Sequence, residues 1–102
     1  VYILTTNIAG LRTGGNVGDL WQQQRDFARS VAQEVVQVQD WLTGQKNDPE
    51  RLIEGMAEAI AADPAHLCTG RSAPARLARA LQHADEAKLG VPILREIQQI
   101  KA

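Results

Sequence analysis

A long amphipathic helix is the sequence feature that most constrains the fold of this chain. Large apolar residues recur from Leu20 to Leu42 at steps close to 3.5 residues, at positions 20, 27, 31, 35, 38 and 42. That spacing places them on one face of an α-helix. Asp19 and Gln22 have the spacing of a capping box at its start, and Gly44 is a typical residue after its end. The pattern predicts a helix of about 25 residues that begins at Asp19.

Three shorter helices are predicted downstream, over residues 49–63, 73–89 and 92–100. Each begins with a cap residue or a proline, and the first two are followed by residues that stop helices. These signals are Asp48-Pro49 and Pro64 for the first segment, Ser72 and Gly90 for the second, and Pro92 for the last. The last segment carries Ile93, Ile97 and Ile100 on one apolar face.

The first 18 residues are predicted to lie outside the helical domain. Residues 1–6 are rich in β-branched and aromatic side chains, which favour a short extended segment. Residues 7–18 contain four glycines, and glycine weakens regular elements, so a flexible loop is expected there. The predicted fold is all-α: a compact bundle of about four helices over 19–102, preceded by an extended, glycine-rich segment over 1–18.

Composition limits what the chain can bind and where it is expected to work. Its 102 residues are 44% hydrophobic, enough for one core, and the net charge of -1 gives no overall attraction to nucleic acid or anionic lipid. No apolar run approaches the roughly 20 residues of a membrane span, and the opening Val1–Leu4 is too short for a signal-peptide core. The single cysteine, Cys68, is ordinary for a reducing compartment. We expect a cytoplasmic protein without membrane contact.

The long predicted helix carries more apolar surface than one core face needs. Trp21 and Trp41 flank the stripe on opposite sides, and Val36 lies well outside it. One interpretation is that the helix is the central rod of the bundle and is contacted on several sides. The other is that part of it meets another protein or a second copy of itself, since aromatic residues anchor interfaces.

Opposite charges are separated on the next two predicted helices. Three glutamates spaced by four residues form an acidic ladder on one helix, and three arginines with a histidine form a basic patch at the other. Both surfaces have a simple interpretation as solvated or internally paired faces. Alternatively, the ladder receives a basic partner or the molecule's own arginines, and the patch contacts phosphates. The acidic set is Glu50, Glu54 and Glu58, and the basic set is Arg71, Arg76, Arg79 and His83.

Patterns for catalysis, nucleotide binding and metal binding are mostly absent. The segment Thr13–Gly18 leads into a helix, but it lacks the G-x-G-x-x-G fingerprint and a following Gly-Lys-Ser/Thr. Asp63, His66 and Cys68, with distant His83, offer metal-ligand types without the spacing of a metal site. Nothing local marks Cys68 as an activated thiol. We therefore predict no enzyme, no metal and no cofactor.

One segment, Ala87–Ile97, has a loose likeness to the turn of a helix-turn-helix motif. A glycine follows one helix, and the short helix after it would read the major groove in that motif. Glu96 and the pair Asp85–Glu86 argue against this interpretation because they lie close to where DNA would run. The residues that would contact nucleic acid are Arg71, Arg76, Arg79, Lys88, Arg95 and Gln98.

The sequence supports one main functional hypothesis and one alternative. The main hypothesis is a non-enzymatic protein-interaction module, such as an accessory subunit, regulator or inhibitor, which docks through helix surfaces onto another protein or self-associates. The alternative is a helix-turn-helix-like regulator that binds nucleic acid. The residues predicted to contact a protein partner are Trp21, Val36 and Trp41 for apolar contact, and Glu54, Glu58, Arg76 and Arg79 for charge selection.

Overall fold

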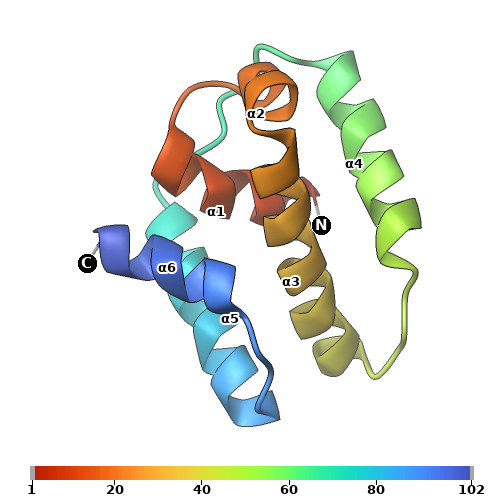
Figure 1. Ribbon diagram of the computed structural model, residues 1–102, viewed down its shortest axis with the longest axis vertical. Helices are drawn as coiled ribbons and strands as arrows, with labels where there is room; N and C mark the ends of the chain where they lie inside the picture. The colour runs from red at the N-terminus through yellow and green to blue at the C-terminus, as the bar shows by residue number, and fades with distance from the viewer. Residues whose placement is uncertain (1, 102) are drawn as a thin grey trace.

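The computed structural model describes the backbone of residues 2–101 and the side chains of residues 2–99. These residues form six α-helices (Figure 1). The helices are α1 (Tyr2–Thr13), α2 (Val17–Gln23), α3 (Arg25–Thr43), α4 (Pro49–Ala62), α5 (Ala73–Ala87) and α6 (Pro92–Lys101). These residues contain no strand, and one isolated bridge joins Asn16 to Leu67. The predicted all-α class is confirmed, with six helices in place of about four.

Helix α1 occupies most of the segment predicted to be extended and glycine-rich. Tyr2–Thr13 is helical although its β-branched residues and Gly10 are modest or poor helix formers. One face of α1 lies in the core, where Ile8 and Ala9 are fully buried. Packing of that face outweighs local propensity. This corrects the expected extended segment over residues 2–6 and loop over residues 7–13. Val1, also expected to be extended, lies outside the described residues.

The long helix predicted from residue 19 is two helices. Asn16 caps α2 by accepting a hydrogen bond from the backbone N–H of Asp19 at 2.8 Å, so the helix begins before Asp19. The chain leaves the helical conformation at Gln24, and α3 begins at Arg25. Glutamines are good helix formers, so no residue at 22–24 signals this break. Gly44 ends α3 in the left-handed conformation, as predicted.

The three downstream helices begin where the sequence predicts. Asp48 caps α4 by accepting a hydrogen bond from a first-turn N–H at 3.1 Å. Helix α5 follows Ser72, whose hydroxyl makes no capping bond and instead accepts a hydrogen bond from Nε of Arg76 at 3.1 Å. Its C-cap is Lys88, which is left-handed and comes two residues before the glycine predicted to end the helix. Helix α6 begins at Pro92.

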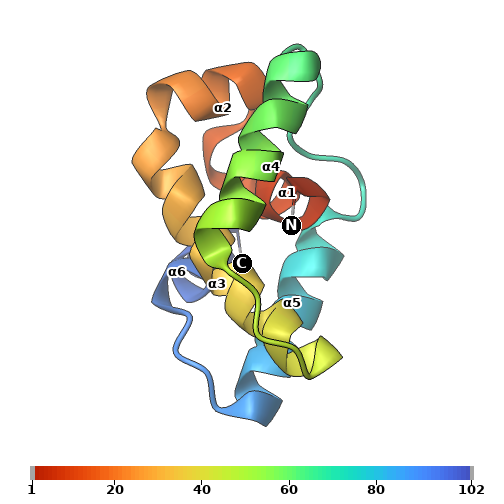
Figure 2. The same ribbon diagram turned by 90° about the vertical axis from the view of Figure 1, so that its right-hand side faces the viewer.

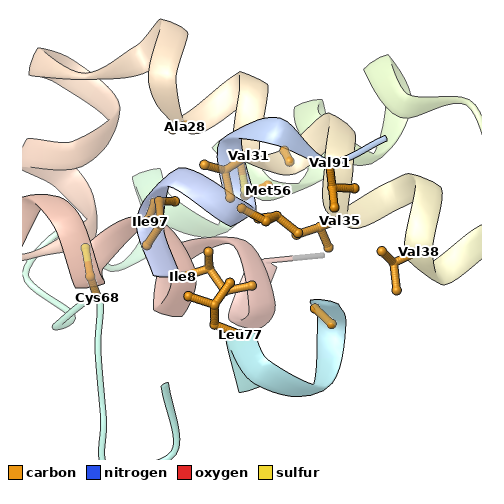
Figure 3. Packing of buried hydrophobic residues seen from close by; sticks show 14 of the residues in the cluster. Ile8, Ala28, Val31, Val35, Val38, Met56, Cys68, Leu77, Val91 and Ile97 are labelled. Carbon is orange, nitrogen blue, oxygen red and sulfur yellow. The ribbon is translucent and has the colours of Figure 1, made fainter. Parts of the chain in front are cut away.

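Helix α1 lies between α3 and α5, and α6 packs across these three helices (Figure 1). Turning the molecule shows α4 on an outer side, joined to its neighbours by extended connections (Figure 2). Side chains from different helices meet in one core, where Ile8 of α1, Leu77 of α5 and Ile97 of α6 point toward one another (Figure 3). The fold is therefore built around α1 and α3.

The connector between α4 and α5 is fixed against α1 and α2. Backbone N–H groups at the start of α2 donate hydrogen bonds to the carbonyls of Pro64 and His66 at 2.9 and 2.8 Å. Two glycines permit this close approach. A Cβ at Gly10 would overlap the Cβ of Cys68, and a Cβ at Gly18 would lie 2.7 Å from the side chain of Pro64. The connector therefore forms part of the packed structure.

Candidate functional site

An open groove with a volume of about 440 Å³ lies between α3 and α5, and the start of α1 contributes to its wall. Apolar side chains come mainly from α1 and α3, and basic side chains come from α5. The lining residues are Leu4, Val38, Gln39, Leu42, Ser72, Ala75, Arg76, Arg79, Ala80 and His83. We call this set the α3–α5 groove.

Helix α5 gives the groove a basic edge. Ser72, Arg76, Arg79 and His83 recur at steps of three and four residues, so they follow one face of the helix. Both arginines are exposed, and neither forms an ion pair with any described residue. The hydrogen bond from Arg76 to Ser72 orients one guanidinium along this edge. The edge therefore offers two guanidinium groups that are free to bind carboxylates.

The last turns of α3 give the groove an apolar wall. Trp41 is 42% exposed and Leu42 is 51% exposed, although leucine and tryptophan are usually well buried. The ring of Trp41 lies beside the ring of His83, with centroids 6.0 Å apart and planes at 45°. Nδ1 of His83 is buried without a hydrogen-bond partner among the described residues. Trp41 is not a lining residue, but through this ring contact it lies next to the His83 end of the groove.

Two residues predicted to contact a protein partner, Arg76 and Arg79, line this groove, and a third, Trp41, lies beside its His83. Val36 is not part of it. Its side chain is 1% exposed, so the prediction of a surface contact at Val36 is wrong. Helix α3 packs against all five other helices, which buries even the residues that lie outside its main apolar stripe. This arrangement agrees with the central-rod interpretation.

The remaining residues predicted to contact a partner lie elsewhere. Trp21 is half-buried, and the guanidinium of Arg25 lies over its ring at 5.3 Å from the centroid. Glu54 and Glu58 are exposed on α4, outside the groove. Glu50, which begins the same acidic ladder, forms an ion pair at 2.7 Å with an arginine of α3. The ladder is therefore partly paired within the molecule.

The N-terminus of α6, which a helix-turn-helix would present to DNA, is occupied by a carboxylate of the same chain. Glu34 of α3 is 7% exposed. Its two oxygens accept hydrogen bonds from the backbone N–H groups of Ile93 at 3.1 Å and Leu94 at 3.0 Å. Val91 and Leu94 are buried, so this end of α6 faces the interior of the bundle. A negative charge at this position stabilises the helix dipole and disfavours a nearby phosphate.

The residues predicted to contact nucleic acid are distributed over several parts of the surface. Arg71 is exposed before α5, Lys88 is exposed at its C-terminus and Gln98 is exposed on α6. Arg95 forms an ion pair with Asp85. Of this predicted set, the two groove arginines alone share one recess.

The described side chains form no metal-binding cluster, since no three His, Cys, Asp or Glu residues among them lie close enough to hold an ion. Cys68 is buried and free. Burial, with a smaller contribution from the charge of Asp19, raises the pKa of its thiol. A raised pKa disfavours the reactive thiolate, so Cys68 has the environment of a structural cysteine.

Comparisons with protein-family models, curated proteins and solved structures give no match for this chain. No helix in the described part of the chain is long and apolar enough to span a membrane.

Sequence reasoning missed the apolar wall of the groove. It assigns Leu42 to the core stripe and Leu4 to an extended segment, whereas both line the groove. One signal was available for Leu42, because Gly44 places it in the last turn of the helix. A residue in a terminal turn has neighbours on one side only along the helix axis. No comparable signal marks Leu4, whose helix was not predicted.

Proposed function

We propose that this chain is a non-enzymatic protein-interaction module that docks onto another protein through the α3–α5 groove. One observation carries the proposal: the half-exposed Leu42 lines a groove together with Arg76 and Arg79, which form no ion pair with any described residue, and the half-exposed Trp41 lies beside His83 of the same groove. Tryptophan and arginine are the residue types that most often dominate the energetics of protein interfaces.

The chemistry of the groove supports a docking role over a catalytic one. Its polar groups are guanidiniums, a hydroxyl, an amide and one imidazole. The hydroxyl of Ser72 accepts a hydrogen bond from Arg76, and the imidazole of His83 lies about 16 Å further along α5, so the two are not placed as a nucleophile and its base. An accessory subunit, a regulator or an inhibitor would use such a surface. A buried free thiol at Cys68 suits a reducing compartment, so we place this role in the cytoplasm.

Site-specific photo-cross-linking tests the proposal. A photoreactive residue replaces Leu42 in one variant and Ala61, exposed on α4, in the control variant. In cells that express the chain natively, we expect a discrete protein adduct from position 42 and none from position 61. The adduct should be lost when the photoreactive variant also carries Arg79→Glu. It should also be lost when an excess of the chain without the photoreactive residue competes for the partner. Equal labelling at both positions, or no adduct at position 42, would contradict the proposal.

The nucleic-acid alternative has weaker support. Glu34 occupies the N-terminus of α6, and Arg95 is already paired with Asp85. Nuclease treatment before irradiation separates the two functions. A docking module keeps its protein adduct at position 42, whereas an adduct bridged by nucleic acid disappears.

A further inference from the structure

We infer that the partner segment occupying the α3–α5 groove is an acidic amphipathic helix of another protein. This inference rests on the proposed function and adds the chemistry of the partner. It follows from the positive charge of the α5 edge and from the shape and apolar character of the α3 wall. It also follows from the poor match between the groove and α4 of a second copy of this chain.

The basic edge selects for carboxylates. Arg76 and Arg79 lie about one helical turn apart, and no described carboxylate pairs with either of them. Arg51 and Arg71 are also exposed without an ion pair among the described residues, but Arg76 and Arg79 are the arginines that line the groove. A guanidinium binds a carboxylate through two parallel hydrogen bonds. Acidic residues three or four positions apart on a partner helix would match the spacing of these arginines.

The shape of the groove favours a helix as its occupant. From Ser72 to His83 the groove follows about 16 Å of α5, which corresponds to about three turns of a partner helix. Apolar residues at i, i+4 and i+7 of such a helix can lie against Leu4 and Leu42 while its acidic flank reaches the arginines. A peptide that binds by strand addition would need a sheet edge for its backbone hydrogen bonds, and the described chain has no strand.

A second copy of this chain is a poorer match for the groove. Its acidic ladder lies on α4, whose large apolar residues Ile53, Met56 and Ile60 are buried in the core of that copy. None of the exposed large apolar side chains in the described part of the chain lies on α4. A docked α4 would therefore supply charge without the apolar anchors that the α3 wall requires.

Selection from a displayed peptide library tests the inference on the folded chain. The library holds peptides of about 14 residues, with leucine fixed at i, i+4 and i+7 and the other positions drawn from Asp, Glu, Lys, Gln and Ala. We expect the selected sequences to be rich in Asp and Glu along one flank. The fluorescence of Trp41, read in a Trp21→Phe variant, should change when such a peptide binds.

Matched variants then locate the binding. Combining Arg76→Gln with Arg79→Gln should weaken the selected peptides by about tenfold or more, and Leu42→Ala should weaken them comparably. Arg71→Gln, which changes an exposed arginine outside the groove, should leave their affinity unchanged. All four positions are exposed, and thermal unfolding of each variant verifies that the fold is retained.

Several outcomes would overturn the inference. These are selection of no binder, selection of lysine-rich or uncharged peptides, and binding that ignores the groove variants. Dimerisation in sedimentation experiments that Leu42→Ala abolishes would assign the groove to a second copy. If cross-linking at position 42 finds a partner while selection yields no acidic helix, the proposed function stands and this inference fails. If cross-linking also fails, both are refuted.

Discussion

Glu34 connects α3 to the N-terminus of α6, and its removal should destabilise the whole fold. Its carboxylate is almost completely buried and accepts hydrogen bonds from the N–H groups of Ile93 and Leu94. No lysine, arginine or histidine among the described residues forms an ion pair with it. The two N–H groups and the helix dipole are therefore the main direct compensation for burying this group.

The magnitude follows from these two bonds. A hydrogen bond to a charged group contributes about 1.5–3 kcal/mol, and a carboxylate at a partly buried helix N-terminus contributes up to about 2 kcal/mol. The two contributions overlap because the same contacts carry both. We expect Glu34→Ala to lower the free energy of unfolding by about 3 kcal/mol, since it leaves the buried N–H of Leu94 without an acceptor. Glu34→Gln keeps one acceptor oxygen and should lose about half as much.

Urea denaturation measures the effect, and amide hydrogen exchange localises it. Glu34→Ala should lower the urea midpoint by about 1–2 M, and exchange at Ile93 and Leu94 should accelerate more than exchange in α4. Gln37→Ala is the control, because Gln37 is exposed on the same helix and should change stability by less than about 0.5 kcal/mol. A loss below about 1 kcal/mol for Glu34→Ala, or unchanged exchange at Ile93 and Leu94, would refute this reasoning.

Three further predictions concern the packing around α1. Gly10→Ala should lower the free energy of unfolding by about 1–3 kcal/mol, because the added Cβ would overlap Cys68. Gly55→Ala, in open space on α4, should raise it by about 0.5–1 kcal/mol, and thermal unfolding of the two variants measures the difference. Thr5→Val removes a buried hydroxyl that has no described hydrogen-bond partner, so the free energy of unfolding should stay unchanged or rise. Thr6→Val removes a hydroxyl that donates a hydrogen bond to the backbone, so urea titration should show a lower free energy of unfolding. Burial raises the pKa of the Cys68 thiol, so the free energy of unfolding should fall as pH rises above about 8.5, because the thiol of the unfolded chain ionises first. Cys68→Ala should make the free energy of unfolding less dependent on pH in this range.

The sequence predicts the helices whose ends carry their own signals. The start of α4 at Asp48 and Pro49 and the end of α3 at Gly44 follow from local chemistry, because cap residues satisfy helix ends wherever the helix packs. Helix α1 and the break at Gln24 do not follow from it. They depend on contacts with elements distant in sequence, such as the approach of the connector at Cys68 to α1. Local propensity contains no information about these contacts.

The basic half of the groove could be predicted, and the apolar half could not. Arg76 and Arg79 share a face of any helix that covers residues 73–87, so their proximity needs no knowledge of the fold. Burial along α3 depends on which helices pack around it. A residue outside the main stripe, Val36, is buried because α3 is surrounded, while Leu42 on the stripe is half-exposed near the end of the helix.

The position of α6 explains why the groove can be tested without disturbing the fold. Helix α6 packs against α1, α3 and α5, and Glu34 holds its N-terminus in place. The core that results includes Val31, Val35 and Val38 of α3 but neither Trp41 nor Leu42. Substituting these two half-exposed residues therefore removes little of the area buried on folding, and stability should change far less than after Glu34→Ala. A loss of binding in such variants would then report the groove itself, because the folded population stays the same.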